Sequence, residues 1–254
     1  MSATRGLMTI DVVGAGPAYT DRVGAAGACY LVRMDGTSIV LDLGQGAFPR
    51  LASMIEPSTI DAVFVSHLHP DHFVDLVSLR HYLRWQFRPS RRVRVVGPAG
   101  LEGRLDALHD EPGFAAAALD VATLGEGSWA FGPLTVTAAK VTHTADSYAF
   151  RVASDRRPAL VYSGDCGRAD DLARLVRTGD TLLSEVSFGP GPVPADVAHL
   201  DGPAVGALAE STGVGAVLLT HLQMGFDERP TIESVRGRYS GPVNLVGPGD
   251  RYTI

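Results

Sequence analysis

The segment Val63-Phe64-Val65-Ser66-His67-Leu68-His69-Pro70-Asp71-His72 joins a short apolar strand to a cluster of three histidines and one aspartate. Histidine is scarce elsewhere, because the chain has 8 histidines in 254 residues. Neutral imidazole nitrogens and carboxylate oxygens are ligands that suit zinc and related metals. His67 and His69, two residues apart in an extended segment, can point to one ion. Asp71 and His72 follow where a helix is expected to begin, and they can turn to a second ion.

Three later residues are candidates to complete these two sites. His143, Asp165 and His221 each stand at the end of an apolar, β-branched run that reads as a strand. Taken alone, each is more typical of an ordinary surface or hydrogen-bonded residue. Combined with the first cluster, the three residues predict a metal centre assembled from the ends of several strands.

The order His-x-His-x-Asp-His, His, Asp, His resembles the metallo-β-lactamase superfamily, and the similarity runs from Gly14 to the last predicted strand. The resemblance implies an α/β fold of the αββα sandwich type, with two β-sheets flanked by helices. It also implies two Zn²⁺ per chain, with manganese or iron as alternatives, because imidazole and carboxylate select weakly among these metals. It assigns His67, His69 and His143 to one ion, Asp71, His72 and His221 to the other, and Asp165 to a bridging position, with Asp71 also counted among the catalytic residues.

A weak internal repeat supports a fold of two related halves. Ala62–Leu68 and Ala216–Leu222 share the pattern Ala-Val, two apolar residues, Ser or Thr, His and Leu. Two such halves would place the metals in the cleft where they meet, a usual position for a small-molecule site. We therefore expect one domain over residues 1–254. Ser66, Thr142 and Thr220 each precede a ligand and either orient neighbouring groups or are ordinary strand-end hydroxyls.

Apolar runs bounded by Gly, Pro and Asp predict the strands, and apolar spacing predicts the helices. Strands are expected at Thr9–Gly14, Ala28–Met34, Ser38–Leu43, Ala62–Ser66, Arg92–Val96, Leu134–Val141, Tyr148–Ala153, Ala159–Tyr162, Thr181–Glu185, Ala216–Thr220 and Val243–Val246. Helices are expected after Asp71 and at Ala169–Arg177, Gly202–Ser211 and Thr231–Tyr239.

The composition is that of an enzyme with a substantial core, since 45% of the residues are hydrophobic and 20% are charged. No apolar run approaches the length of a membrane span, and Met1–Arg5 leads straight into a strand rather than into a signal peptide. Cys29 and Cys166 are too few for a disulfide framework, which favours the cytoplasm. The net charge of −6 argues against general nucleic-acid binding.

The arginine-rich segment, Arg80–Arg94, is an exception to this acidic balance, because it carries six arginines and no acidic residue. Two interpretations remain open at this point. The segment could draw a phosphorylated substrate toward the metals. It could also be a solvated helix end, where cations suit the negative end of the helix dipole.

Two further segments distinguish among hydrolases. Glu185 ends an apolar strand, and His199 precedes an alanine-rich helix. This pairing resembles the RNase Z-like branch of the superfamily, in which the histidine protonates the leaving oxygen and the glutamate holds its other ring nitrogen. Members that mature tRNA carry different residues in these two loops and insert a long basic arm before the bridging aspartate. Here 21 residues separate His143 from Asp165, so tRNA is not expected as a substrate.

Three classes of function stay open. The favoured one is a phosphodiesterase of small or cyclic nucleotide phosphodiesters. The alternatives are a lactone, carboxyl-ester or β-lactam hydrolase with the same metal site, and an RNase Z-like nuclease. The aromatic residues of the helix after Asp71 (Tyr82, Trp85 and Phe87) exceed what one core face needs, and RNase Z-like relatives pair through this region. We therefore expect a symmetric homodimer.

Overall fold

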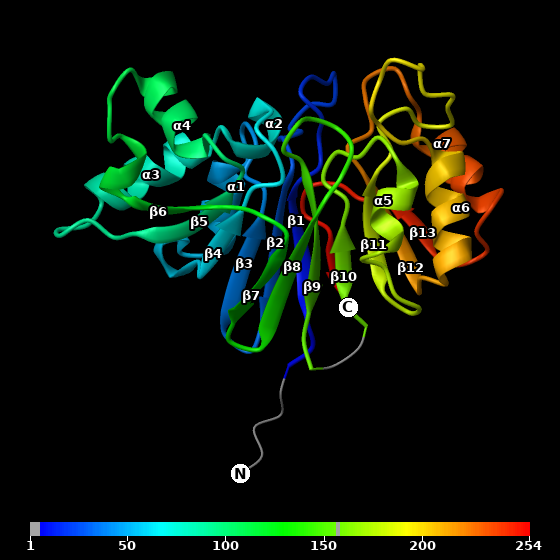
Figure 1. Cartoon of the computed structure of the whole chain (residues 1–254), viewed down its shortest axis with the longest axis horizontal. Helices are drawn as coiled ribbons and strands as arrows, with labels where there is room; N and C mark the ends of the chain where they lie inside the picture. The colour runs from blue at the N-terminus through cyan, green and yellow to red at the C-terminus, as the bar shows by residue number, and fades with distance from the viewer. Residues whose placement is uncertain (1–5, 156–157) are drawn as a thin grey trace, which may run out of the picture.

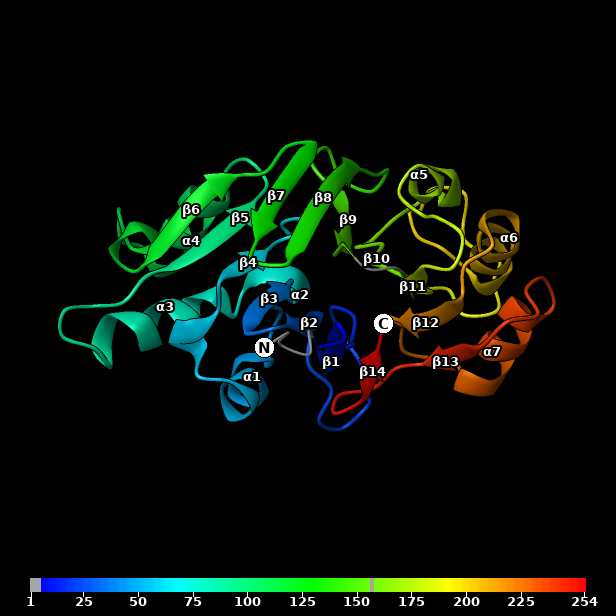
Figure 2. The same ribbon diagram turned by 90° about the horizontal axis from the view of Figure 1, so that it is seen from below.

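The computed structural model of the chain describes residues 6–155 and 158–254. Met1–Arg5, which the sequence expects to lead directly into a strand, lie outside these residues. Within the described ranges, two seven-stranded sheets pack face to face, and helices cover the outer face of each (Figures 1 and 2). The predicted αββα sandwich is therefore confirmed.

The first sheet is antiparallel at one side and parallel at the other. Its strands lie in the spatial order β14 (Arg251–Thr253), β1 (Thr9–Gly14), β2 (Cys29–Met34), β3 (Thr37–Leu41), β4 (Ala62–Phe64), β5 (Val93–Gly97) and β6 (Leu119–Thr123). The parallel part, from β3 to β6, brings the carboxyl ends of these strands to one edge of the sheet.

The second sheet has the same mixture of parallel and antiparallel pairs. Its strands lie in the spatial order β13 (Val243–Leu245), β12 (Ala216–Thr220), β11 (Thr181–Glu185), β10 (Leu160–Tyr162), β9 (Tyr148–Ala153), β8 (Leu134–Lys140) and β7 (Gly127–Phe131). β4 and β12, which carry the internal repeat, each lie in the parallel part of their own sheet. The two-half organisation expected from the repeat is thus present in the topology.

The helices follow the same division between the halves (Figure 1). The first half contains α1 (Phe48–Met54), α2 (Pro70–Phe73), α3 (Leu76–Trp85) and α4 (Leu101–His109), with short 3₁₀ turns at Pro57–Thr59 and Ala115–Ala117. The second half contains α5 (Ala169–Ala173), α6 (Gly202–Thr212) and α7 (Glu228–Arg236). Among the described residues, none of these helices has the length and apolar character needed to cross a bilayer.

Alternating side chains of the strands divide the apolar interior into three layers. In β2, Tyr30 and Val32 point to the core between the sheets, whereas Leu31 points to the helices on the outer face. In β11, Leu183 faces the central core and Leu182 faces the second helical layer. Because successive side chains of a strand point to opposite faces, both faces of these strands are buried and their sequences are almost continuously apolar.

Several elements differ from the sequence-based expectation. The predicted helix after Asp71 is two helices, α2 and α3, because the chain turns at Val74-Asp75. α5 ends at Ala173, earlier than expected, and α7 begins three residues earlier at Glu228. Elements that the sequence analysis missed are β6, β7, β14, α1 and α4.

Candidate metal centre

All predicted metal ligands lie at or just beyond the carboxyl ends of strands, whereas His199 lies in the loop before α6. His67 to His72 follow β4 and enter α2, while His143 follows β8, Asp165 follows β10 and His221 follows β12. Carboxyl ends of parallel strands meet at one edge of a sheet, where open α/β folds place their ligand sites. In both halves this edge is the one that carries α2 (Figure 1), so the two sheets deliver their polar side chains to one place.

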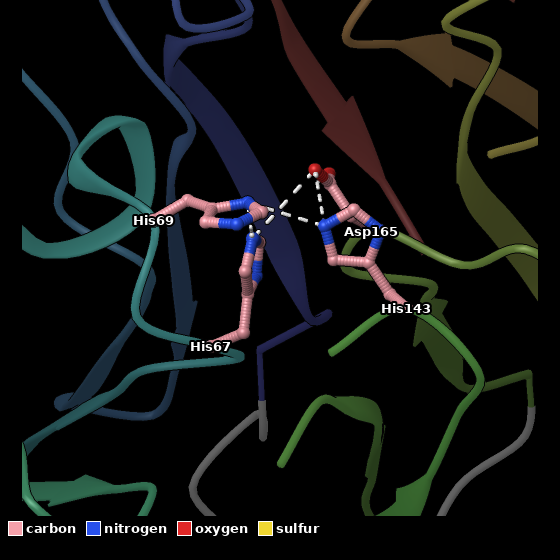
Figure 3. Close-up of side chains that lie close together, drawn as sticks. All are labelled: His67, His69, His143 and Asp165. Carbon is pink, nitrogen blue, oxygen red and sulfur yellow. Dashed lines mark hydrogen bonds and ion pairs between the residues drawn. The ribbon is translucent and has the colours of Figure 1, made fainter. Parts of the chain in front are cut away.

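Four of these residues form a first group, in which the side chains point toward one another (Figure 3). Nδ1 of His69 lies 2.9 Å from Nε2 of His67 and 3.2 Å from Nε2 of His143. Oδ2 of Asp165 lies 3.7 Å from Nε2 of His67 and 3.5 Å from Nε2 of His143. The structure thus gathers the three histidines that the sequence assigned to one ion.

A second group lies on the other side of Asp165 and contains Asp71, His72 and His221. Nε2 of His221 is 3.1 Å from Oδ2 of Asp71, and Nε2 of His72 is 3.6 Å from the same oxygen. The second carboxylate oxygen of Asp165, Oδ1, lies 3.3 Å from Nε2 of His72 and 3.5 Å from Nε2 of His221. Asp165 therefore presents one oxygen to each group, as a bridging ligand would.

The residues present fit metal ions, because they leave buried polar atoms without partners. Oδ1 of Asp71, Nε2 of His72 and Oδ1 of Asp165 are buried and make no hydrogen bond. A buried polar atom without a partner costs about 1–3 kcal/mol, and three such atoms in one cluster are unusual for a purely structural arrangement. Cations between these atoms would satisfy them.

In His72, His143 and His221, the ring nitrogen that points away from the cluster, Nδ1, contacts a second residue. His72 donates from Nδ1 to Oδ2 of Asp42 at 2.7 Å, and His143 donates from Nδ1 to the carbonyl of Ala198 at 2.8 Å. These bonds fix the tautomer with a lone pair on Nε2, the nitrogen that faces the cluster. His221 is held in the same way, since its Nδ1 lies 3.0 Å from Oγ of Ser187.

The electrostatics of the cluster differ from one imidazole to the next. Burial alone would lower the pKa of His72 and of His221, but the carboxylate of Asp165 outweighs it and raises both, so a cation that binds there would displace their protons. Burial lowers the pKa of His67 well below its usual value, so its imidazole is neutral. Burial alone would raise the pKa of Asp165, but the imidazoles of His221 and His72 outweigh it and hold the pKa well below the usual carboxyl range. The cluster thus offers a neutral imidazole and an ionised carboxylate.

Asp42 is a functional residue that the sequence analysis missed. Its fully buried carboxylate accepts hydrogen bonds from Oγ of Ser66 at 2.8 Å, from the hydroxyl of Tyr162 at 2.7 Å and from His72. It also adopts a φ of 58°, in the left-handed region. The only sequence signal was an acid directly after an apolar strand and before Gly44, because its partners are distant along the chain.

Only one of the three hydroxyls expected to orient ligands does so. Oγ of Ser66 lies 3.1 Å from Nδ1 of His67. The hydroxyl of Thr220 instead contacts Tyr30 at 2.6 Å, and Thr142 uses its backbone N–H to bind Asp171. Thr142 and Thr220 therefore support the fold at strand ends.

His199 and Glu185, predicted to be a pair, are in direct contact. Nδ1 of His199 lies 2.9 Å from Oε1 of Glu185, whose carboxylate is fully buried. Its other oxygen accepts hydrogen bonds from the backbone N–H groups of Ser187 and Leu200 at 3.1 and 3.3 Å. Burial alone would lower the pKa of His199, but the hydrogen bond to Glu185 outweighs it and raises the pKa.

Cys166, beside the bridging aspartate, is a supporting residue. Its backbone N–H donates to Glu185 at 2.7 Å, and its thiol donates to the carbonyl of Arg168 at 3.1 Å. Burial raises the pKa of this thiol to about 12. The thiol is in none of the groups of described residues that could hold a metal.

Three residues of the arginine-rich segment make contacts within the fold. The segment runs from the middle of α3 through the next loop to the start of β5. It lies at the left side of Figure 1, away from the edge that carries α2. Arg80 is buried and donates to the carbonyl of Phe114 at 2.7 Å. Arg92 donates to two main-chain carbonyls, and Arg94 pairs with Asp120 at 2.8 Å. These contacts explain Arg80, Arg92 and Arg94 without a substrate.

Two of the cavities that border the cluster are lined by His69. The central cavity has a volume of about 290 Å³, and its walls include Tyr19, Asp71, Asp165, His199, His221 and Gln223. The side cavity has a volume of about 250 Å³, and its walls include His69, Pro98, Arg104 and Thr144. Since His69 lines both, the candidate metal centre is reached from two sides.

Comparison with known proteins identifies the family. Residues 39–222 match the model of the β-lactamase superfamily domain. The chain belongs to this superfamily. Membership makes it a metallo-hydrolase whose His/Asp cluster can hold metal, and it confirms the superfamily that the motif order predicted.

Individual members of the superfamily show how far the similarity extends. Uncharacterized protein Rv1339 of Mycobacterium tuberculosis is 31% identical over 227 residues, which cover 85% of this chain and 82% of that protein. Ribonuclease Z of Pyrobaculum arsenaticum is 24% identical, with 89% and 91% covered. The crystal structure of the metallo-β-lactamase fold protein YhfI from Bacillus subtilis superimposes with a TM-score of 0.86 at 22% identity, with 96% and 98% covered. The predicted similarity to RNase Z proteins is thus confirmed.

Proposed function

We propose that this chain is a dinuclear metal-dependent phosphodiesterase that acts on small or cyclic nucleotide phosphodiesters. The observation that carries the proposal is the His199–Glu185 pair beside the candidate metal centre. Glu185 occupies Nδ1 of His199, and among the described residues Nε2 of His199 has no partner. An imidazole held in this way can deliver a proton from Nε2 to a leaving oxygen in the central cavity, which His199 lines.

The metal ligands proposed are those of the two groups described above. His67, His69 and His143 would hold one ion, Asp71, His72 and His221 would hold the other, and Asp165 would contact both. When bound, two such ions lower the pKa of water and neutralise charge on a phosphate group. We propose zinc, with manganese or iron as alternatives, because the donors are imidazole and carboxylate only.

A proton donor helps to expel any leaving oxygen of high pKa, that of a lactone or alkyl ester as well as that of a nucleotide phosphodiester. The similarity of the chain to ribonuclease Z is what favours the phosphodiester. The leaving oxygen of a nucleotide phosphodiester is an alkoxide of high pKa, whose expulsion without a proton is slow. His199 is raised in pKa by Glu185 and lines the central cavity. It is therefore placed to donate, while Glu185 keeps the ring oriented.

The two cavities suit a diester with substituents on both sides of phosphorus. One substituent would occupy the central cavity beside His199, and the other would enter the side cavity beyond His69. Their volumes of about 290 and 250 Å³ are at or just below the lower end of ordinary small-molecule sites. A short nucleotide diester fits this scale better than a long polymer. A cyclic nucleotide, whose two ester oxygens belong to one ribose, would occupy the central cavity alone.

The absence of a long insertion favours a small substrate over tRNA. The chain between His143 and Asp165 contributes β9 and β10, which are integral strands of the second sheet. Ribonuclease Z of Pyrobaculum arsenaticum, by its name, cleaves RNA, but three of the arginines that could grip a polymer here, Arg80, Arg92 and Arg94, are engaged in the fold. We therefore place a nuclease activity second.

A substrate screen tests the proposal. Protein loaded with zinc or with manganese is assayed on cyclic AMP, bis-p-nitrophenyl phosphate, a homoserine lactone and nitrocefin. We expect turnover of the two phosphodiesters and little or none of the lactone and the β-lactam. Faster hydrolysis of the lactone or of nitrocefin would overturn the proposal in favour of an acyl-transfer hydrolase.

We further propose a homodimer located in the cytoplasm. Trp85 at the end of α3 is 62% exposed, which is high for such a large apolar side chain. Tyr82, in contrast, packs on Phe48 and Phe87 within the same subunit. Both cysteines are free and buried, in keeping with a reducing compartment. A light-scattering mass near 26.8 kDa at micromolar concentration would contradict the dimer.

A further inference from the structure

Tyr19 is an aromatic side chain with an unusual environment. It is 64% exposed and lines the central cavity together with Asp71, Asp165 and His199. Among the described residues it has no hydrogen-bond or ring partner. A large ring left uncovered at the wall of a cavity that contains candidate catalytic groups is available to contact a ligand.

The segment that carries this ring, residues 16–25, is tied to other parts of the chain by side-chain hydrogen bonds. Arg22 donates to the carbonyl of Leu222 at 2.7 Å and to a second carbonyl in the loop beyond it at 2.9 Å. Gln45 donates from Nε2 to the carbonyl of Pro17 at 3.2 Å. These contacts fix the segment on both sides of the ring, so little order would have to be created when a ligand binds.

Gln223 lies on the opposite strand-end loop and lines the same cavity. Its backbone N–H donates to the carbonyl of Ser187 at 3.2 Å, which fixes the residue. Its side-chain amide has no partner among the described residues. A glutamine amide offers a donor and an acceptor side by side, the pattern that pairs with the edge of a nucleobase, best with adenine.

We propose that Tyr19 is the stacking platform for the nucleobase of the substrate and that Gln223 binds the edge of the same base. This inference rests on the proposed function and names its substrate class, nucleotide phosphodiesters rather than phosphodiesters in general. Stacking of a base on an aromatic ring is tolerant of base identity, whereas an amide at the edge adds preference. Since His199 lines the same cavity, the nucleoside is the part of the substrate that carries the leaving oxygen.

The test compares two cyclic phosphates that differ only in the base. Cyclic AMP and the base-free methyl riboside 3′,5′-cyclic phosphate are hydrolysed by zinc-loaded protein, with both reactions followed by phosphorus NMR. We expect Tyr19→Leu to raise KM for cyclic AMP by roughly 5- to 100-fold and to change kcat little, because stacking is lost without touching the reacting groups. For the base-free compound we expect a change of less than about twofold.

Three further variants separate stacking from a structural role. Tyr19→Phe and Tyr19→Trp keep an aromatic face and should retain the KM for cyclic AMP. Val23→Ala lies in the same segment, at a fully exposed residue that does not line the central cavity, and should behave as the unchanged protein. Gln223→Ala should raise KM for cyclic AMP and leave the base-free compound unaffected. Equal effects of Tyr19→Leu on both compounds would overturn the inference and leave the phosphodiesterase proposal standing.

A binding measurement distinguishes this failure from failure of the proposed function itself. AMP and ribose 5-phosphate are titrated into metal-loaded protein by calorimetry. If neither cyclic phosphate is hydrolysed, the proposed function fails. In that event, tighter binding of AMP than of ribose 5-phosphate that Tyr19→Leu abolishes would still support the base platform. Equal affinities for the two monophosphates, or affinities that Tyr19→Leu leaves unchanged, would overturn it.

Discussion

Oδ2 of Asp42 lies 2.7 Å from Nδ1 of His72, although the two residues are 30 positions apart in the chain. This carboxylate is buried beneath the metal cluster and accepts further hydrogen bonds from Ser66 and Tyr162. It therefore fixes the ring of His72 with Nε2 toward the cluster. A carboxylate in this position also makes an imidazole a better donor to a metal.

The first prediction follows from this contact. Asp42→Asn keeps the shape of the side chain but removes its charge, so it should lower the affinity for metal by about 10- to 100-fold. Competition with a chelator measures this affinity. Tyr162→Phe is the matched control, because it removes one hydrogen bond to the same carboxylate without disturbing its charge. Unchanged metal affinity in Asp42→Asn would show that the contact serves folding alone.

The second prediction concerns Asp165, which presents one oxygen to each group of ligands. Asp165→Asn should lower the metal content of both sites together and abolish activity, since one carboxylate serves both ions. Elemental analysis and circular dichroism report metal and fold on the same sample. Asp120→Asn removes an exposed carboxylate far from the cluster and should keep its metal. Full metal content in Asp165→Asn would refute the bridging role.

The third prediction concerns the packing that places α2. A Cβ added to Gly44 would lie 1.9 Å from the carbonyl oxygen of Asp71, and that carbonyl accepts a hydrogen bond from Ala28. Gly44→Ala should therefore destabilise the fold by about 1–3 kcal/mol or more and weaken metal binding. Gly103→Ala, in α4, meets no atom within 4 Å and should stabilise its helix by up to about 1 kcal/mol. Chemical denaturation measures both, and equal stabilities would contradict the steric argument.

The ligand residues could be predicted from sequence because their chemistry is local. His67 and Asp71 follow a short apolar strand, so the neighbouring residues alone indicated candidate ligands beyond a strand end. Asp42 could not be recognised, since its role depends on Ser66 and Tyr162, whose approach is decided by the packing of both sheets. Ser187, which contacts His221, was missed for the same reason.

The missed secondary structure has a related cause. In β6 only the first residue is buried, and the residues of β7 are all exposed or half-buried. Neither carries the continuous apolar signal of the central strands. α4 contains Gly103, a residue that weakens a helical pattern. At these positions, pairing and packing with neighbouring elements determine the structure more than local preference does.

The last prediction separates proton donation from binding. His199, Asp165 and His221 lie close enough to hold an ion, but Glu185 occupies Nδ1 of His199, the nitrogen that lies 4.0 Å from Asp165. His199→Ala should therefore keep both metals and the fold. It should lose roughly 10²–10⁴ in rate on cyclic AMP, whose leaving alkoxide needs a proton. The loss should be much smaller on bis-p-nitrophenyl phosphate, because p-nitrophenolate leaves without protonation. His109→Ala, a partly exposed histidine of α4, should change neither rate. Equal losses on both substrates would mean that His199 positions the substrate, and the proposed donor would have to be sought elsewhere in the central cavity.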